Sequence, residues 1–426
     1  MTRKLKDSGI EWVGEIPVNW NINTAFQIFS PVKSKNIGMQ ENNLLSLSYG
    51  RIIKKDINSS FGLLPESFEG YNIIEPDDIV LRLTDLQNDH TSLRVGLSEQ
   101  RGIITSAYLT LRAIIDCSPR YLYYQLHSFD ICKGLYGMGA GVRQGLNWEG
   151  IKALKMVVPD IDEQERIVEF LDHQCAEIDA VIAKTKATIE EYKKLKQSII
   201  TNAVTKGIRG NDRPMKDSGI EWIGDIPADW KVLKMKHLGK CRNGLTYSPE
   251  NLVSEEEGML VLRSSNIQDG KLVFGDNVYV NCEIREELMV KSGDILICSR
   301  NGSRALIGKN ALIPEGLLAS FGAFMMIFRC NSPRYVQMIL NSAVFSYYLG
   351  TFLTSTINQL TADNFNNMQI VYCEDETEQE EITRYLEKKC AEIDTLIAKK
   401  TALLEEMESY KKSVIYEYVT GKKEVQ

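Results

Sequence analysis

Two glycine-rich segments are the first places where this sequence could carry chemistry, because glycine loops that open onto a helix can hold phosphate groups. Residues 302–309 have part of the spacing of a phosphate loop, but five residues separate the two outer glycines and Asn310 follows Lys309. A phosphate loop has four intervening residues and a Ser or Thr after the lysine. Residues 137–141 alternate glycine like a dinucleotide-binding loop, yet no clear strand precedes them and no helix follows. Neither segment therefore predicts a nucleotide site.

The remaining catalytic residue types form no recognisable site. Four scattered histidines offer neither metal-ligand spacing nor a hydrolase triad. Nine cysteines form no Cys-x-x-Cys pair and leave an odd thiol, which indicates free thiols in a reducing compartment. No two prolines are adjacent, so the Asn/Asp-Pro-Pro-Tyr/Phe motif of amino-methyltransferases is absent. The sequence therefore predicts a chain that performs no catalysis and binds no metal or cofactor of its own.

Length and charge set the broad class of the protein. The 426 residues are enough for two to four domains and contain no apolar run long enough to span a membrane. The N-terminus has no apolar signal core, so we expect a cytoplasmic protein. The net charge is −7, but residues 21–160 hold 14 basic and 14 acidic side chains, and residues 231–373 hold 14 and 12. The acidic excess lies outside these two regions, which leaves room for local basic patches.

An internal duplication organises the chain. Residues 5–20 recur as residues 215–230 with eleven of sixteen positions identical, including the run Lys-Asp-Ser-Gly-Ile-Glu-Trp. A second repeat joins residues 163–205 to residues 378–420, with Glu-Gln-Glu and Cys-Ala-Glu-Ile-Asp in both copies. Each half therefore consists of a short motif, a divergent insert and a long helix. An old duplication with drifted loops would leave the same trace, but two unlike inserts in one frame favour a scaffold that presents two different readers.

The two long helices carry an apolar seam. Their apolar residues recur at steps of three, four or seven, which is typical of a coiled coil. Helices of roughly 45 residues would be about 65 Å long at 1.5 Å per residue. We expect the first to end at Gly207 and the second at Gly421. The predicted seam residues are Ile167, Leu171, Ile178, Ile182, Ile189, Ile199, Ile382, Leu386, Ile393, Ile397, Leu404 and Val414.

Two matching seams in one chain most simply pack on each other. If a pseudo-two-fold axis relates the halves, the helices run antiparallel and hold two globular regions apart. A coiled coil that only dimerises with another chain is the alternative. The predicted domains are residues 1–160, a helix over 161–207, residues 208–375 and a helix over 376–426.

The inserts predict two small α/β regions. Strand-like runs occur at residues 78–83, 103–112, 293–298 and 324–329, and a helix is expected after each Ser-Pro-Arg-Tyr sequence. Four of the five tryptophans, Trp12, Trp20, Trp222 and Trp230, lie in the repeated motifs. We expect them to anchor the motifs by packing. The fold class is therefore α+β, with two α/β domains separated by two long helices that pack as an intrachain antiparallel coiled coil with a pseudo-two-fold repeat.

The Lys-Asp-Ser-Gly-Ile-Glu-Trp motif and its continuation to Pro17 and Trp20 resemble the N-terminal signature of specificity subunits of type I restriction-modification systems. The Glu-Gln helix starts, followed by Ile167 and Ile382, are similar to the repeated spacer helices of that family. Residues 142–159 are similar to its junction between insert and helix. Residues 370–373 depart from it, because Ile-Val-Tyr-Cys replaces the expected proline-bearing run.

The resemblance implies a non-catalytic DNA-recognition subunit with two target recognition domains, each reading one half of a split, asymmetric site. It implies partners as well: double-stranded DNA, two adenine methyltransferase (M) subunits that use S-adenosylmethionine, and motor-nuclease (R) subunits that use ATP and Mg. The helices would set the spacing between the half-sites and dock the methyltransferases.

Residues suited to DNA contact lie in both inserts. Bidentate Arg, Asn or Gln side chains read bases, and Lys, Arg, Ser or Thr position the phosphates. In the first insert we predict contacts by Tyr49, Arg51, Lys54, Lys55, Arg82, Gln87, Asn88, Ser92 and Arg94. In the second we predict contacts by Arg263, Ser264, Ser265, Asn266, Arg300, Asn301, Ser303, Arg304 and Lys309.

Two other functions stay open at this point. One is a coiled-coil scaffold without a DNA role, and the other is a self-contained DNA methyltransferase or nuclease. Methyl transfer or cleavage by the pure chain would indicate the second, which the missing motifs disfavour.

Overall fold

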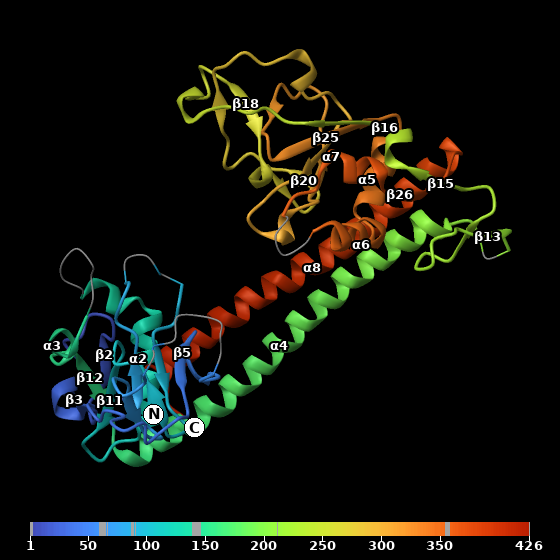
Figure 1. The fold of residues 1–426 in the computed structure, drawn as a ribbon. Helices are drawn as coiled ribbons and strands as arrows, with labels where there is room; N and C mark the ends of the chain where they lie inside the picture. Colours follow the sequence, from blue (N-terminus) through green and yellow to red (C-terminus); the bar gives the residue numbers. More distant parts are fainter. Residues whose placement is uncertain are drawn as a thin grey trace. The chain divides into compact units, whose positions relative to one another are not determined.

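The computed structural model describes residues 3–58, 65, 67–86, 89, 91–138, 146–210, 212–353 and 358–425. Contacts divide the chain into two compact units. Unit 1 comprises Met1–Lys186 and Ala402–Gln426, and unit 2 comprises Ala187–Thr401. Two long helices, α4 (Ile161–Lys206) and α8 (Glu376–Val419), each contribute a segment to both units. The fold is mixed α/β, as the sequence predicts (Figure 1).

Unit 1 is built around a four-stranded antiparallel sheet in the order β4-β11-β8-β9. The predicted strand over 103–112 is interrupted, because Tyr108 N–H donates to the Thr105 carbonyl and turns the chain between β10 and β11. The strands of unit 1 are β1 (Leu5–Asp7), β2 (Glu15–Pro17), β3 (Asn21–Thr24), β4 (Phe29–Pro31), β5 (Leu45–Ser48), β6 (Arg51–Lys54), β7 (Asn72–Ile74), β8 (Ile79–Leu81), β9 (Val95–Leu97), β10 (Gly102–Ile104), β11 (Leu109–Ala113) and β12 (Lys155–Val158).

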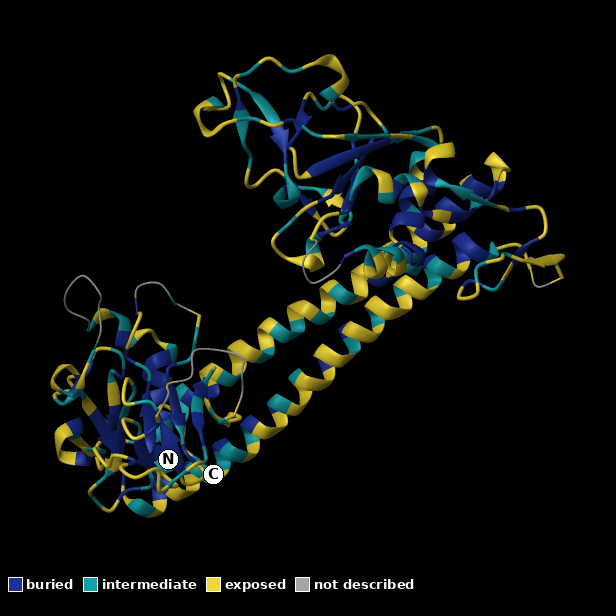
Figure 2. Ribbon diagram, in the orientation of Figure 1, coloured by how far each residue is buried: buried dark blue, intermediate teal, exposed yellow. Residues whose placement is uncertain are grey.

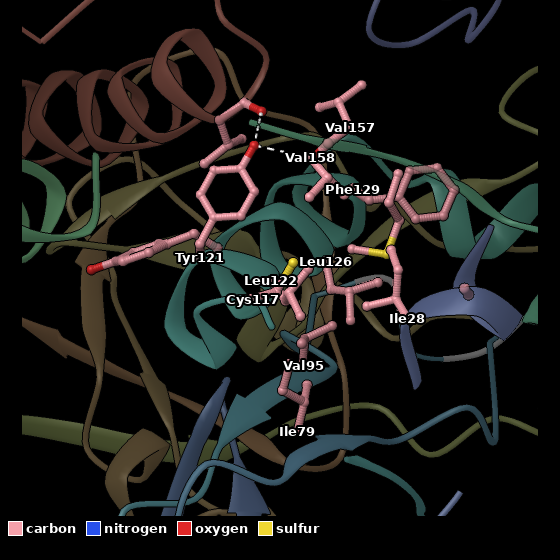
Figure 3. Close-up of a cluster of buried hydrophobic side chains, with 14 of the residues drawn as sticks. Ile28, Ile79, Val95, Cys117, Tyr121, Leu122, Leu126, Phe129, Val157 and Val158 are labelled. Atoms are coloured by element: carbon pink, nitrogen blue, oxygen red, sulfur yellow. Dashed lines mark hydrogen bonds between the residues drawn. The ribbon is translucent and has the colours of Figure 1, made fainter. Parts of the chain in front are cut away.

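Helix α2 (Pro119–Ile131) organises the core of unit 1. A helix is present as predicted, but it begins inside the Ser-Pro-Arg-Tyr sequence and not after it: the Ser118 side chain accepts from Tyr121 N–H, and Pro119 occupies the first turn. The shorter helices α1 (Ala25–Ile28) and α3 (Trp148–Ile151) flank it in sequence. Tyr121 is fully buried, and its hydroxyl lies 3.2 Å from the Val157 carbonyl and 3.3 Å from the Val419 carbonyl (Figure 3). One phenol thus joins α2 to β12 and to the end of α8.

Unit 2 has a corresponding antiparallel sheet in the order β16-β25-β22-β23 and a second sheet in the order β17-β21-β18-β24. The predicted strands over 293–298 and 324–329 are β22 and β25. The strands of unit 2 are β13 (Met215–Asp217), β14 (Asp225–Pro227), β15 (Lys231–Lys234), β16 (Gly239–Asn243), β17 (Leu252–Val253), β18 (Met259–Leu262), β19 (Ile267–Gln268), β20 (Lys271–Leu272), β21 (Tyr279–Val280), β22 (Ile295–Cys298), β23 (Asn310–Leu312), β24 (Ser320–Phe321), β25 (Met325–Cys330) and β26 (Gln369–Tyr372). Its short helices are α5 (Pro333–Leu340), α6 (Ala343–Phe352) and α7 (Ala362–Asn367).

Each of the two sheets contains an equivalent ion pair between a buried aspartate and a partly exposed arginine, at positions outside the obvious sequence repeats. In unit 1, Arg112 reaches both carboxylate oxygens of buried Asp78 at 2.7 Å. In unit 2, Arg329 reaches both oxygens of buried Asp294 at 2.6 Å. Bidentate pairs of this kind fix the orientation of neighbouring strands. The duplication therefore extends into inserts whose sequences hardly match.

Each repeated motif forms a short hairpin that packs against the first turn of a long helix. Trp20 is fully buried, and its indole N–H donates to Glu163 of α4 at 2.9 Å. Trp230 is also fully buried and donates to Glu378 of α8 at 3.3 Å. In both units an arginine, Arg3 or Arg213, pairs with that same glutamate. The predicted role of these tryptophans as packing anchors is confirmed for Trp20 and Trp230.

Segments of α4 and α8 pair within each unit. In unit 1, Asp179 of α4 binds Lys411 of α8 at 2.7 Å, and Lys186 lies 3.5 Å from Glu408. In unit 2, Lys196 of α4 binds Asp394 of α8 at 2.6 Å. Within unit 1, rising residue numbers on α4 meet falling numbers on α8, so the segments run antiparallel there.

The predicted seam lies on the covered side of both helices. Every one of the predicted seam residues is buried or half-buried. Most lysines and glutamates of the two helices are exposed, and buried and exposed positions alternate along both helices (Figure 2). Helix α4 is followed by Gly207 with φ +77°, and α8 is followed two residues later by Gly421 with φ +69°. A left-handed residue after a helix favours glycine, which explains why these positions end the helices as predicted. No helix among the described residues is both long and apolar enough to cross a membrane.

Candidate nucleic-acid interface

A tight hairpin presents the first group of predicted contact residues in unit 1. Strands β5 and β6 pair through Ser48 and Arg51, which leaves Tyr49 and Gly50 as a two-residue turn. Both turn residues have positive φ, which is the geometry of hairpin turns that match the strand twist. Tyr49 is 74% exposed, and Arg51, Lys54 and Lys55 are exposed as well. The hairpin therefore carries three cations and one exposed aromatic ring.

Arg94 does not belong to this surface, and its prediction as a DNA contact is wrong. Its side chain is fully buried in unit 1. The guanidinium donates to the carbonyls of Thr84 at 2.6 Å, Asp85 at 3.1 Å and Asp89 at 2.5 Å, and to the Tyr136 hydroxyl at 3.1 Å. The buried Arg94 side chain thus holds together the described residues that lie between β8 and β9.

The other candidates of this segment have mixed positions. Arg82 and Ser92 are half-buried. The Ser92 side chain and backbone N–H, together with Thr91, hold the pKa of the Asp89 carboxyl well below its usual range. Gln87 and Asn88 lie outside the described residues. The described residues of this segment are therefore held by a buried arginine and an ionised aspartate.

In unit 2 the structure brings five predicted residues into one groove. Arg263, Ser264, Ser265, Arg300 and Asn301 come from two separate loops and line a common space of about 1070 Å³. This grouping is what a recognition surface needs, because base readout requires several polar ends aimed at one place.

The polar groups of the groove are not equally available. Arg263 donates to the Asp276 carboxylate at 2.8 Å, and Asn301 donates its amide to the Ser264 hydroxyl at 3.0 Å. The Arg300 guanidinium lies 5.2 Å from the centre of the Phe324 ring. Within the described residues, Arg300 forms no ion pair, so its fork of donors stays available.

Asn266 is the second correction. It is fully buried, its side-chain oxygen accepts from Arg263 N–H at 2.9 Å, and its amide donates to the Val273 carbonyl at 3.0 Å. It supports the loop and cannot reach DNA. Ser303, Arg304 and Lys309 lie beyond the groove lining, and Arg304 donates to the Gly350 carbonyl at 3.3 Å.

Sequence reasoning missed several groove residues. Phe324 is 57% exposed although its sequence position reads as part of a buried strand. Tyr247, Asn358 and Gln359 also line the groove. The adjacent amides of Asn358 and Gln359 are a residue type suited to base readout and could have drawn attention. Nothing in the sequence marks Phe324 as exposed.

Unit 1 holds a smaller pocket of about 370 Å³ between its insert and its helix segments. Charged residues line it, but they neutralise one another: Asp179 binds Lys411 at 2.7 Å and Arg120 binds Asp172 at 2.7 Å. His127 also lines it, and burial, with a smaller contribution from Lys411, lowers the pKa of that imidazole to about 4. The described residues contain no group of His, Cys, Asp and Glu suited to a metal ion.

Comparison with known proteins gives a consistent answer. No protein-family model matches the chain. The type I restriction enzyme MjaVIII specificity subunit of Methanocaldococcus jannaschii is 25% identical over 338 residues, which cover 76% of this chain and 75% of that protein. The putative type I restriction enzyme MjaX specificity subunit of the same organism is 24% identical over 438 residues, covering 96% and 95%.

The fold points the same way. A chain from a structural study of complex assembly and conformational transition in the type I R-M system matches with a TM-score of 0.69 at 15% identity, covering 95% of this chain and 98% of that one. Sequence therefore relates this chain to the specificity subunits of type I restriction enzymes, and its fold is that of a chain from such a system.

Proposed function

We propose that this chain is the sequence-recognition subunit of a type I restriction-modification complex and has no catalytic activity of its own. One observation carries the proposal. The same frame of buried tryptophan, glutamate and arginine occurs in both units, as Trp20 with Glu163 and Trp230 with Glu378, while the inserts held by this frame differ. A repeated frame with unlike inserts suits two readers of two different DNA sequences.

In this proposal, residues 1–160 and 208–375 are the two target recognition domains, and each reads one half of a bipartite, asymmetric site. Helices over 161–207 and 376–426 form an intrachain antiparallel coiled coil that sets the spacing of the half-sites. The ion pairs of Asp179 with Lys411 and of Lys196 with Asp394, inside the two separate units, support this pairing. Successive turns of the duplex recur about every 34 Å, so spaced readers can meet separate half-sites.

The proposed partners supply all the chemistry. Two adenine methyltransferase subunits would dock on the helices and use S-adenosylmethionine, and motor-nuclease subunits would use ATP and Mg. The complex would act in the cytoplasm on double-stranded DNA. The exposed cations of the β5–β6 hairpin and Arg300 of the unit 2 groove are suited to phosphate and base contacts.

Exchange of one insert tests the proposal. The chain is expressed with its methyltransferase in a host whose modified adenines are then sequenced. A variant keeps the repeated motifs and helices but carries the insert over residues 21–158 from another specificity subunit. We expect one half of the methylated sequence to change and the other half and the spacer to stay. A reciprocal exchange of residues 231–372 serves as the matched control and should change only the other half.

Two results would contradict the proposal. If both halves of the methylated sequence changed with one insert, the readers would not be independent. If no methylation depended on the chain, the DNA role itself would be wrong.

A further inference from the structure

We infer that Arg300 and Gln359 form a base-reading pair in the unit 2 groove, with Arg300 reading a guanine and Gln359 an adenine in neighbouring base pairs. The inference rests on the proposed function and refines it by separating the groups that read bases from those that hold the groove together.

Backbone geometry places the two residues side by side. Arg300 and Gln359 face each other in an isolated antiparallel bridge, and Leu360 N–H donates to the Ser299 carbonyl at 2.8 Å beside it. Directly opposed residues of an antiparallel pair project from the same face, with Cβ atoms about 5 Å apart. Both residues are exposed and both line the groove. Because neighbouring bases on one strand are about 3.4 Å apart, the two side chains can reach two adjacent base pairs.

Two other polar side chains of the groove, Arg263 and Asn301, are already engaged. Arg263 is bound to the Asp276 carboxylate, and Asn301 donates to Ser264 while its oxygen accepts from Ser303 N–H. Among the described residues, neither the Arg300 guanidinium nor the Gln359 amide forms a hydrogen bond to another side chain. Both ends can therefore still form paired hydrogen bonds to a base edge.

Phe324 positions the arginine. Its exposed ring lies 5.2 Å from the Arg300 guanidinium carbon, and its carbonyl accepts the Arg300 N–H at 3.1 Å. Such a contact limits the orientations of the guanidinium before DNA arrives. A planar arginine fork matches the O6 and N7 acceptors of guanine, and a glutamine amide matches the N6 donor and N7 acceptor of adenine. The chemistry of the two free ends therefore assigns the two bases.

The test uses the full chain with its methyltransferase subunits and measures binding to duplexes that carry every single-base change in the site found by adenine sequencing. Arg300→Ala should lower discrimination at one guanine position by roughly 5- to 150-fold, which is the range for one bidentate contact. Gln359→Ala should do the same at one adenine in the same half-site. Arg300→Lys keeps the charge without the fork, so it should keep the salt dependence of binding and still lose guanine discrimination.

Arg285→Ala is the matched control, because Arg285 is an exposed arginine of the same unit that does not line the groove, so its loss should leave every position as selective as in the wild type. Phe324→Ala should weaken the same guanine preference as Arg300→Ala, whereas Phe324→Tyr should restore it. If Arg300→Ala weakened binding to all duplexes by the same factor, the variant would select the same bases as the wild type. Arg300 would then be a phosphate contact, and the proposed base-reading pair would be wrong. A wild-type complex that selected no sequence would instead overturn the proposed function.

Discussion

The buried guanidinium of Arg94 offers a direct test of how unit 1 is built. We consider Arg94→Met, which keeps an unbranched apolar side chain in the same space and removes the charge and its donors. In the wild type, Arg94 donates to the carbonyls of Arg82, Thr84, Asp85 and Asp89. The substitution leaves these carbonyls without that partner.

The expected cost follows from the number and burial of these contacts. A buried polar group that loses its partner costs about 1–3 kcal/mol, although water that enters the loop would recover part of this for the outermost carbonyls. Removing one partner from a buried charged network costs about 3–5 kcal/mol. Because Arg94 is fully buried, we expect the upper of these two ranges for the free energy of unfolding of unit 1.

Urea unfolding of the full chain measures this cost, and hydrogen exchange locates it. Amides between β8 and β9 should exchange faster in the variant, because Arg82 N–H and the Arg94 carbonyl pair at the base of the loop at 2.9 Å. Arg101→Met is the matched control. Arg101 is half exposed and its ion pairs to Glu41 and Glu75 lie at the surface, so its loss should cost less than about 1 kcal/mol.

One result would refute this reasoning. If Arg94→Met unfolded at the same urea concentration as the wild type but bound DNA more weakly, with a smaller salt dependence, then Arg94 would contact phosphate and could not be buried as described.

Two further predictions concern stability. Burial lowers the pKa of His127 to about 4, below its unfolded value of about 6.5, so the neutral form stabilises unit 1 and this stability should fall by roughly 3 kcal/mol as pH drops from about 6.5 to 4. His127→Gln should remove that slope in urea unfolding at pH 4 to 7, and an unchanged slope would contradict the assignment. Gly421→Ala should cost more than Gly270→Ala in thermal unfolding, since both have positive φ but only the new Cβ at 421 would lie 2.5 Å from Pro17 and 3.1 Å from Trp20. If both substitutions lowered the unfolding temperature equally, Pro17 and Trp20 would move away from the new Cβ without an energetic cost.

The sequence alone was sufficient for features that are local or periodic. A repeat of eleven identical positions in sixteen reveals two equivalent halves whatever their contacts. Apolar residues at heptad spacing lie on one side of a helix, and all of the predicted seam residues are buried or half-buried. Glycine adopts a positive φ without a steric penalty, and a residue with positive φ ends a helix. Gly207 and Gly421 could therefore be predicted from the sequence as the helix ends.

Only the tertiary structure decided which polar residues face solvent. Arg94 and Arg300 have the same side chain and similar glycine-containing and serine-containing surroundings in sequence, yet one is enclosed by carbonyls and the other stands over an exposed ring. Burial depends on neighbours far away in the sequence, such as Tyr136 for Arg94. The pairing of Arg300 with Gln359 likewise joins positions 59 residues apart, which no spacing rule predicts. Side-chain type determines what contacts a residue can form, and long-range packing determines which of those contacts it does form.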